Sequence, residues 1–309
     1  MTMNNNFLNN LLNSISVSGY EEQVQDIVEE EMKDYVDEVR RDEMQNVTCV
    51  INPNSDIRIM LSAHADEIGL MISNIREDGR LQVIDRGGIV PSTYPGHAIS
   101  IKTSKGIVYG VVEAYRELFK EKDLGTKQFL IDIGAKDRED ALSYVSIGDP
   151  IVLDTTIRKL ANDKFTARAL DDRLGVYIIM EAIKRAKKQG CTVGVYAAST
   201  TGEETTKTGA YWTSTRINPS MAIVVDVTYT SDCSGMDPAE MGTVLLGGGP
   251  VLCNSPIVVK ALNTKMEECA KTAGIQIQRE AASRLSYTDG DKIHFSNQGV
   301  PTVLVSIPL

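Results

Sequence analysis

The residues IRIMLSAHADE, at positions 57–67, are the most informative part of the sequence for the fold class. Residues 57–63 form a short, mainly apolar run that is typical of a buried strand. The run ends directly at His64, and Asp66 and Glu67 follow. In open α/β sheets, functional side chains gather at the carboxyl edge, where successive strands end. We therefore interpret this stretch as a core strand that delivers His64 to such an edge.

The sequence on either side of this strand alternates between helical and extended patterns. Upstream, Ser18 and Glu21 have the spacing of a capping box, and a helix with one apolar face is expected to end near residue 36. Downstream of residue 164 the pattern predicts, in order, helix 173–188, strands 192–199 and 221–226, helix 256–272 and a last strand 302–307. This alternation predicts the α/β class, with a sheet covered by helices.

Residues 70–163 have a different texture. Short alternating runs at 81–84, 98–102 and 107–112 are separated by turns rich in Gly, Pro and charged residues. Such runs are typical of a small β-barrel or sandwich. We predict a catalytic α/β domain made of residues 1–69 and 164–309, interrupted by a β-rich domain at 70–163.

Composition narrows the classes of partner. The 309 residues have a net charge of −10, with 42% apolar and 24% charged residues, which is the balance of a globular protein. An acidic chain is a poor match for nucleic acid or an anionic membrane, because both are polyanions. We therefore expect neither as a partner.

Cysteine usage and the absence of long apolar runs indicate a compartment. The five cysteines are odd in number and contain no Cys-x-x-Cys pair, which disfavours a disulfide framework and a thiolate zinc site. No apolar run reaches the roughly 20 residues needed to span a bilayer. The first residues lack the basic segment and cleavage site of a signal peptide. We expect a cytoplasmic protein.

Acidic and imidazole side chains recur at the ends of the predicted elements. The clusters are His64, Asp171-Asp172, Glu203-Glu204 and Asp226. Divalent metals need carboxylate and imidazole ligands that converge on one point. Because these four clusters terminate separate elements, we expect them to meet in a metal site.

Two neighbouring pairs suggest a division of roles. Asp66 lies two residues beyond His64, close enough to hold the second N–H of the imidazole and fix its tautomer. Of the adjacent Glu203 and Glu204, one carboxylate can bind metal while the other takes a proton from the attacking water.

Several motifs resemble a known family in order and spacing. They are SAHADEIG (62–69), IDRGGIVPSTYPG (84–96), ARALDDR (167–173), TGEET (201–205), VVDVT (224–228) and PTVLVSIP (301–308). Together they resemble the M42 metallo-aminopeptidases, which include glutamyl and deblocking aminopeptidases. The resemblance implies a zinc-aminopeptidase-like mixed sheet flanked by helices, with an inserted β-barrel-like dimerisation domain. It also implies homo-oligomers, from dimers to dodecamers.

The resemblance also assigns roles to the clustered residues. His64 and Asp226 would ligate one metal, Glu204 the other, and Asp171 would bridge the two. Glu203 would be the general base, with Asp66 as a second catalytic residue beside His64. The implied cofactors are two divalent ions per subunit, zinc or cobalt. The implied reaction is hydrolysis of the N-terminal residue from a peptide substrate.

The sequence departs from the family pattern in two places. Family members have a histidine ligand in a tail beyond the last strand, and this chain stops at Leu309, so we expect the second metal site to be weak or empty. His97 and His294 are interpreted as surface or packing residues rather than substitutes. The family more often has Gln before the paired glutamates and an apolar, glycine-containing run after them, where this chain has Thr205–Thr208. The alternative function is a catalytically silent member that acts as a metal-binding or assembly scaffold.

Overall fold

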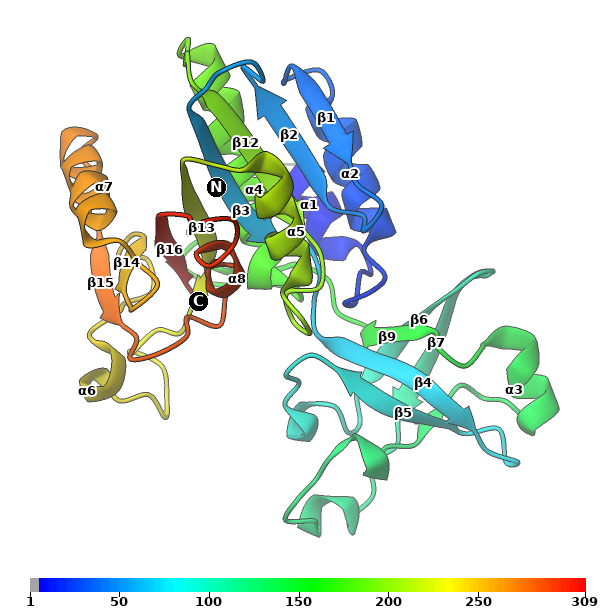
Figure 1. The fold of residues 1–309 in the computed structure, drawn as a ribbon. Helices are drawn as coiled ribbons and strands as arrows, with labels where there is room; N and C mark the ends of the chain where they lie inside the picture. The colour runs from blue at the N-terminus through cyan, green and yellow to red at the C-terminus, as the bar shows by residue number, and fades with distance from the viewer. Residues whose placement is uncertain (1–5) are drawn as a thin grey trace.

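The computed structural model describes residues 6–309. Its larger part is a mixed eight-stranded sheet flanked by helices, and its smaller part is a closed β-barrel connected to one end of the sheet (Figure 1). This agrees with the predicted α/β class and with a β-rich insertion. The boundaries of the two domains, 1–69 with 164–309 and 70–163, stay a prediction.

The large sheet has the order β1-β2-β12-β3-β13-β16-β14-β15. The strands are β1 (Glu38–Arg41), β2 (Val47–Ile51), β3 (Arg58–His64), β12 (Gly194–Thr200), β13 (Met221–Thr228), β14 (Val251–Asn254), β15 (Gln278–Ala281) and β16 (Thr302–Pro308). The neighbours β12, β3, β13 and β16 are parallel to one another. Parallel strands have both faces covered and read as continuous apolar runs. All seven residues of β12 are buried, as this rule requires.

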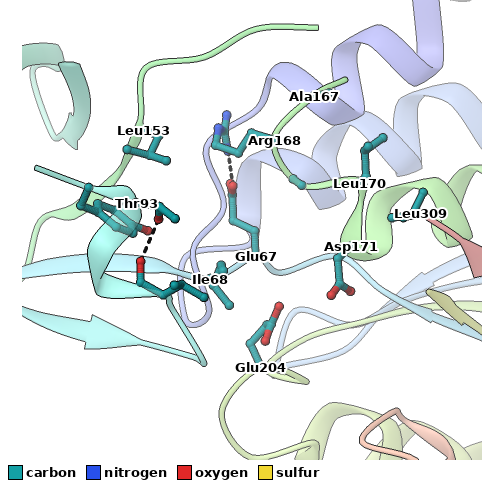
Figure 2. Close-up of a pocket in the computed structure, with 13 residues that line it drawn as sticks. Glu67, Ile68, Thr93, Leu153, Ala167, Arg168, Leu170, Asp171, Glu204 and Leu309 are labelled. Atoms are coloured by element: carbon teal, nitrogen blue, oxygen red, sulfur yellow. Dashed lines mark hydrogen bonds and ion pairs between the residues drawn. The ribbon is translucent and has the colours of Figure 1, made fainter. Parts of the chain in front are cut away.

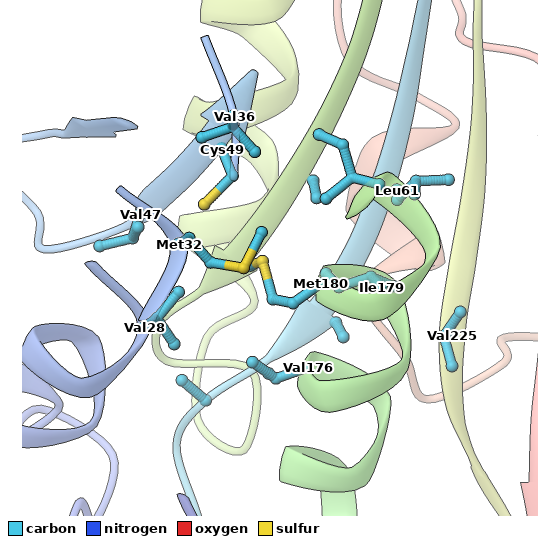
Figure 3. Packing of buried hydrophobic residues seen from close by; sticks show 14 of the residues in the cluster. Val28, Met32, Val36, Val47, Cys49, Leu61, Val176, Ile179, Met180 and Val225 are labelled. Carbon is cyan, nitrogen blue, oxygen red and sulfur yellow. The ribbon is translucent and has the colours of Figure 1, made fainter. Parts of the chain in front are cut away.

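Helices cover both faces of the sheet. One face packs against α2 (Glu22–Met32) and α4 (Leu170–Lys188), with α1 (Asn6–Asn13) beside them. Figure 3 shows Met32 of α2 and Met180 of α4 meeting over the sheet. The other face packs against α5 (Thr208–Ile217) and the short α8 (Gly290–Ile293). Two further helices, α6 (Pro238–Met241) and α7 (Lys260–Thr272), lie near the β14–β15 end of the sheet (Figure 1).

Three local expectations need correction. The first predicted helix ends at Met32 rather than near residue 36, and the helix expected at 256–272 begins only at Lys260. Ser18 and Glu21 do not form a capping box: Glu21 is the N-cap residue of α2 and makes no side-chain capping bond. The Glu21 carboxylate instead accepts the N–H groups of Gly19 and Gly202, at 2.8 and 3.1 Å. The Glu21 side chain therefore joins one local contact, to Gly19, with one long-range contact, to Gly202.

The inserted part is a closed barrel with the strand order β4-β5-β8-β7-β6-β9. Its strands are β4 (Gly69–Ile75), β5 (Leu81–Arg86), β6 (Ala98–Thr103), β7 (Gly106–Val112), β8 (Ile131–Asp132) and β9 (Pro150–Leu153). The interior is filled by aliphatic side chains and Phe129. The same region contains α3 (Arg138–Tyr144) and the 3-10 turns η1 (Pro91–Thr93), η2 (Leu118–Lys120) and η3 (Thr126–Gln128).

A two-stranded ribbon, β10 (Arg158–Lys159) with β11 (Phe165–Thr166), leads the chain back to the large sheet. Throughout the described residues, 6–309, the helices are too short or too polar for any of them to cross a bilayer.

Candidate metal centre

The parallel strands of the large sheet bring the predicted residues to one edge. His64 is the last residue of β3 and pairs in register with Thr200 at the end of β12. Val224 of β13 pairs with Ser62 of β3, so Asp226 lies level with His64 on the other side. Glu203 and Glu204 follow β12 after a short turn. The carboxyl ends of three neighbouring strands thus converge, as the α/β rule predicts.

Three of the predicted ligands form a compact cluster. One ligand atom from each of His64, Asp171 and Asp226 lies within 4.8 Å of the other two. The closest pair is His64 Nε2 and Asp171 Oδ1, at 3.1 Å. His64 and Asp226 are buried, whereas Asp171 is exposed. One imidazole and two carboxylates are a donor set that suits a divalent ion such as zinc.

Asp171 and Asp172 open α4 in an irregular turn, and the peptide bond between them is cis. Asp171 turns toward His64, while Asp172 is buried beneath the cluster. The Asp172 carboxylate accepts the backbone N–H of His64 at 3.3 Å and that of Gly175 at 3.1 Å. Asp172 therefore fixes the start of α4 against the end of β3.

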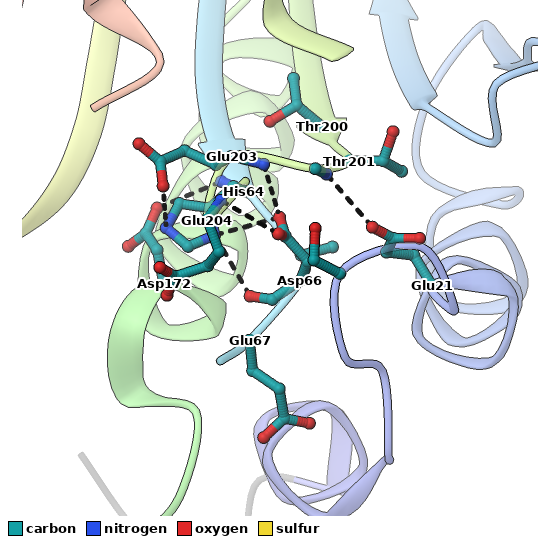
Figure 4. Close-up of polar contacts among 12 residues, drawn as sticks. Glu21, His64, Asp66, Glu67, Asp172, Thr200, Thr201, Glu203 and Glu204 are labelled. Carbon is teal, nitrogen blue, oxygen red and sulfur yellow. Dashed lines mark hydrogen bonds and ion pairs between the residues drawn. The ribbon is translucent and has the colours of Figure 1, made fainter. Parts of the chain in front are cut away.

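Asp66 connects the imidazole to the paired glutamates (Figure 4). Its Oδ1 lies 3.4 Å from His64 Nδ1, and its backbone carbonyl oxygen is 3.2 Å from the same nitrogen. The two carboxylate oxygens accept the backbone N–H groups of Glu203 and Glu204, at 3.0 and 3.1 Å. The contact with the ring agrees with the sequence-based expectation. The two N–H contacts were not foreseen, because backbone partners leave no residue signature.

The paired glutamates occupy different surroundings. Glu203 is only 5% exposed; its Oε2 lies 3.9 Å from His64 Nε2, and its Oε1 accepts a hydrogen bond from the ammonium of Lys207. Burial raises the pKa of Glu203, whereas the charges of His64 and Lys207 oppose the rise. Burial also raises the pKa of Glu204, to about 8. The charge of His64 opposes this rise, and the negative charge of Asp171 adds to it.

The concentration of buried acids is itself evidence for a cation site. Burial raises the pKa of both Asp172 and Asp226 well above the usual range, and repulsion between neighbouring carboxylates raises them further. The pKa of His64 also lies well above its ordinary value: burial opposes the charged ring, but hydrogen bonds to Asp171 and Asp66 outweigh it. A divalent ion would stabilise the charged carboxylates and take the place of the imidazole proton. The residues therefore fit a metal in both geometry and charge.

Asp289 belongs to the site although sequence reasoning missed it. It is buried and lies directly before α8. Its Oδ2 accepts the hydroxyls of Ser62 on β3 and Thr200 on β12, at 2.8 and 2.6 Å. These bonds brace the two strands that carry His64 and lead to Glu203. No motif in the sequence marks Asp289, since its partners lie 227 and 89 residues away.

A cavity of about 410 Å³ adjoins the cluster (Figure 2). Asp171 and Glu204 form its inner wall, and apolar side chains such as Ile68, Val90 and Leu170 form much of the rest. Opposite them, Glu67 pairs with Arg168, so these two charges compensate each other. The volume of this cavity falls in the range of small-ligand sites.

Residues 45–309 match the M42 glutamyl aminopeptidase family. The chain belongs to the M42 peptidase family. The predicted family is confirmed, and the chain is accordingly a peptidase enzyme.

Two curated relatives are similar to this M42 peptidase over almost the whole chain. The lysyl aminopeptidase of Pyrococcus furiosus is 31% identical, over 97% of this chain and 87% of the relative. A putative aminopeptidase of Acetivibrio thermocellus is 34% identical, over 96% of this chain and 87% of the relative.

Two solved structures are similar to this M42 peptidase in fold. The TET aminopeptidase from a marine sediment archaeon of the Thaumarchaeota has a TM-score of 0.90 and 31% identity, covering 98% of this chain and 87% of that one. The dodecameric PhTET1-12s has a TM-score of 0.87 and 30% identity, covering 98% and 89%. These neighbours agree with the predicted mixed sheet and inserted barrel.

The remaining histidines of this M42 peptidase lie outside the cluster. His97 is exposed, and His294 bonds through Nδ1 to the carbonyl of Gly290 at 2.9 Å. Glu204 is not one of the three clustered ligands; it lies on the adjoining cavity wall beside Asp171. The roles predicted for His64, Asp66, Asp171, Glu203, Glu204 and Asp226 stay predictions.

Proposed function

We propose that this M42 peptidase is a two-metal aminopeptidase that removes the N-terminal residue from peptides. The observation that best supports the proposal is the cluster of His64, Asp171 and Asp226 beside Glu203 and Glu204. The adjoining cavity offers space for a substrate side chain.

His64 and Asp226 would hold one metal ion and Glu204 the other, with Asp171 between them. Metal ions bound there would polarise the scissile carbonyl and lower the pKa of the attacking water. Zinc or cobalt suits these ligands. Asp66 would keep the imidazole oriented, and it also holds the backbone of both glutamates through their N–H groups.

Glu203 is suited to move the proton. Its Oε2 faces the cluster, 3.9 Å from His64 Nε2, while its backbone N–H is held by Asp66. It would accept a proton from the water as the oxygen attacks the carbonyl carbon. It would then donate that proton to the leaving amine as the C–N bond breaks.

The remaining expectations belong to the same proposal. Residues 70–163 would form the dimerisation domain of a homo-oligomer, since solved relatives include a dodecamer and TET1 assemblies described as a tetrahedron or an octahedral shell. The protein would act in the cytoplasm on peptides.

The proposal is tested by hydrolysis of aminoacyl p-nitroanilides after loading with zinc or cobalt. We expect turnover of free N-terminal substrates and none of the N-acetylated analogue. Glu203→Gln should lower kcat by about 10²–10⁴-fold, because the proton carrier is lost, and bound metal should be unchanged. Glu267→Gln, at an acid on α7, is the matched control.

The alternative, a catalytically silent scaffold, makes a different forecast. Metal would bind with no hydrolysis of any substrate in the panel, and Glu203→Gln would change nothing measurable. Loss of metal from Glu203→Gln would instead mean that base and ligand are exchanged between Glu203 and Glu204.

A further inference from the structure

Lys207 has an unusual backbone conformation. It precedes α5 with φ of 57° and ψ of 18°, in the left-handed region. Its backbone N–H closes the turn by donating to the carbonyl of Gly202 at 2.7 Å. This region is sterically unfavourable for residues with a Cβ, and glycine adopts it readily. A lysine here therefore costs stability, and such a position suggests that its side chain has a function.

The Lys207 side chain reaches back to the general base proposed above. Its ammonium contacts Oε1 of Glu203, four residues earlier. The lysine side chain is 21% exposed and that of Glu203 is 5% exposed, so water screens the pair little. This distinguishes it from an ion pair between fully exposed side chains, which contributes little.

The pair divides the two oxygens of Glu203 between different partners. Oε1 is held by Lys207, and Oε2 points to the cluster, 3.9 Å from His64 Nε2. The backbone of Glu203 is already held by Asp66. The backbone contact leaves the side-chain torsions of Glu203 free, and Lys207 restrains these torsions.

We propose that Lys207 is a positioning residue for Glu203, holding one carboxylate oxygen so that the other faces the reacting water. The inference rests on the proposed function, in which Glu203 carries the proton. Lys207 itself touches no reacting atom. Its effect should therefore appear in the rate of the chemical step and not in substrate binding.

The test uses three substitutions in the metal-loaded, full-length chain. Lys207→Met removes the charge but keeps the length of the side chain. Lys207→Gly removes the side chain and relieves the left-handed backbone, so its Tm should not fall below that of Lys207→Met. Both should lower kcat by about 10–100-fold, the scale of a misplaced catalytic group. KM should stay within about 3-fold and metal content should be unchanged, because the change acts through Glu203.

Lys207→Arg supplies the rescue, since it keeps the positive charge, and should recover most of the lost kcat. Two control substitutions reproduce, at other sites, the loss of a lysine charge and the relief of a left-handed backbone. Lys265→Met removes a lysine from an exposed ion pair with Glu268, and Asn162→Gly relieves another left-handed residue. Neither control should change kcat.

A double substitution separates positioning from a general structural role. If Lys207 acts only through Glu203, adding Lys207→Met to Glu203→Gln should cost almost no further activity. An equal additional loss in both backgrounds would overturn the inference. So would unchanged or increased kcat in Lys207→Met and Lys207→Gly, or a rise in KM alone. A wild-type chain that binds metal but hydrolyses nothing would instead refute the proposed function.

Discussion

At the scale of single residues, Glu21 connects the start of α2 to the turn that carries the paired glutamates. Both of its hydrogen bonds use the same oxygen, Oε1, which accepts from Gly19 and from Gly202. Gly202 directly precedes Glu203 and Glu204. Burial and then the negative charge of Asp66 raise the pKa of Glu21 from its ordinary value of 4.5 to about 7.

Glu21 should therefore make stability depend on pH. A carboxyl whose pKa is raised by folding holds its proton more tightly in the native state. The contribution of Glu21 to the free energy of unfolding is complete below pH 4.5 and is lost as the pH rises to about 7. Glu21→Gln keeps the oxygen that accepts both bonds and removes the charge. We expect equal stability near pH 4.5 and a gain on the order of 3 kcal/mol at pH 8 for the variant.

Urea unfolding across this pH range measures the difference between Glu21→Gln and the wild type. Glu22→Gln, at the exposed neighbouring position, should show no such divergence. A constant difference at every pH would contradict the assigned titration.

At the scale of elements, α4 is tied to the N-terminal segment by Arg173. This side chain is fully buried and pairs with Glu67 at 2.8 Å. It also donates to the carbonyls of Leu11, Ser14 and Ala65, at 2.9, 2.6 and 3.0 Å. One guanidinium thus joins the end of α1, the segment after β3 and the start of α4, which carries Asp171.

Arg173→Met should be strongly destabilising. Methionine fills similar space, but it cannot donate to the carbonyl of Ala65, and it leaves Glu67 with Arg168 as its one remaining cationic partner. Breaking a buried charge pair costs about 3–5 kcal/mol. Urea unfolding should show this loss, and Arg185→Met, at an exposed position of the same helix, should show almost none. Equal midpoints for the two variants would refute the bracing role.

At the scale of the whole molecule, the proposed ligands come from separate parts of the fold. His64 ends β3, Asp171 begins α4 and Asp226 lies on β13. They are brought together only in the folded chain, so a metal ion would bind the native state far better than the unfolded one. Folding and metal binding should be coupled.

Addition of zinc or cobalt should therefore raise Tm, and a chelator should reverse the rise. An ion at 100 times its Kd stabilises the native state by about 2.7 kcal/mol. Asp226→Asn should remove most of this response, whereas Asp232→Asn, at an exposed position, should retain it. Scanning calorimetry with and without metal measures both. A response that persists in Asp226→Asn would place the ion elsewhere.

The sequence alone determined the architecture and the chemical type of the site. Apolar runs identified the strands β3, β12 and β13, a helical pattern identified α4, and short alternating runs identified the β-rich insertion, because side-chain burial follows the period of each element. The clusters around His64, Asp171, Glu203 and Asp226 were visible because each follows or begins such an element.

Only the tertiary structure decided how these residues are held. Asp289 bonds to strands far away in the chain, Glu21 bonds to Gly202 instead of capping α2, and Asp66 accepts two backbone N–H groups. Lys207 contacts Glu203 across a tight turn, in which Lys207 itself has a left-handed conformation. Local periodicity records which face of an element is buried. Contacts between distant segments depend on how the elements pack, and no residue pattern near either partner records that.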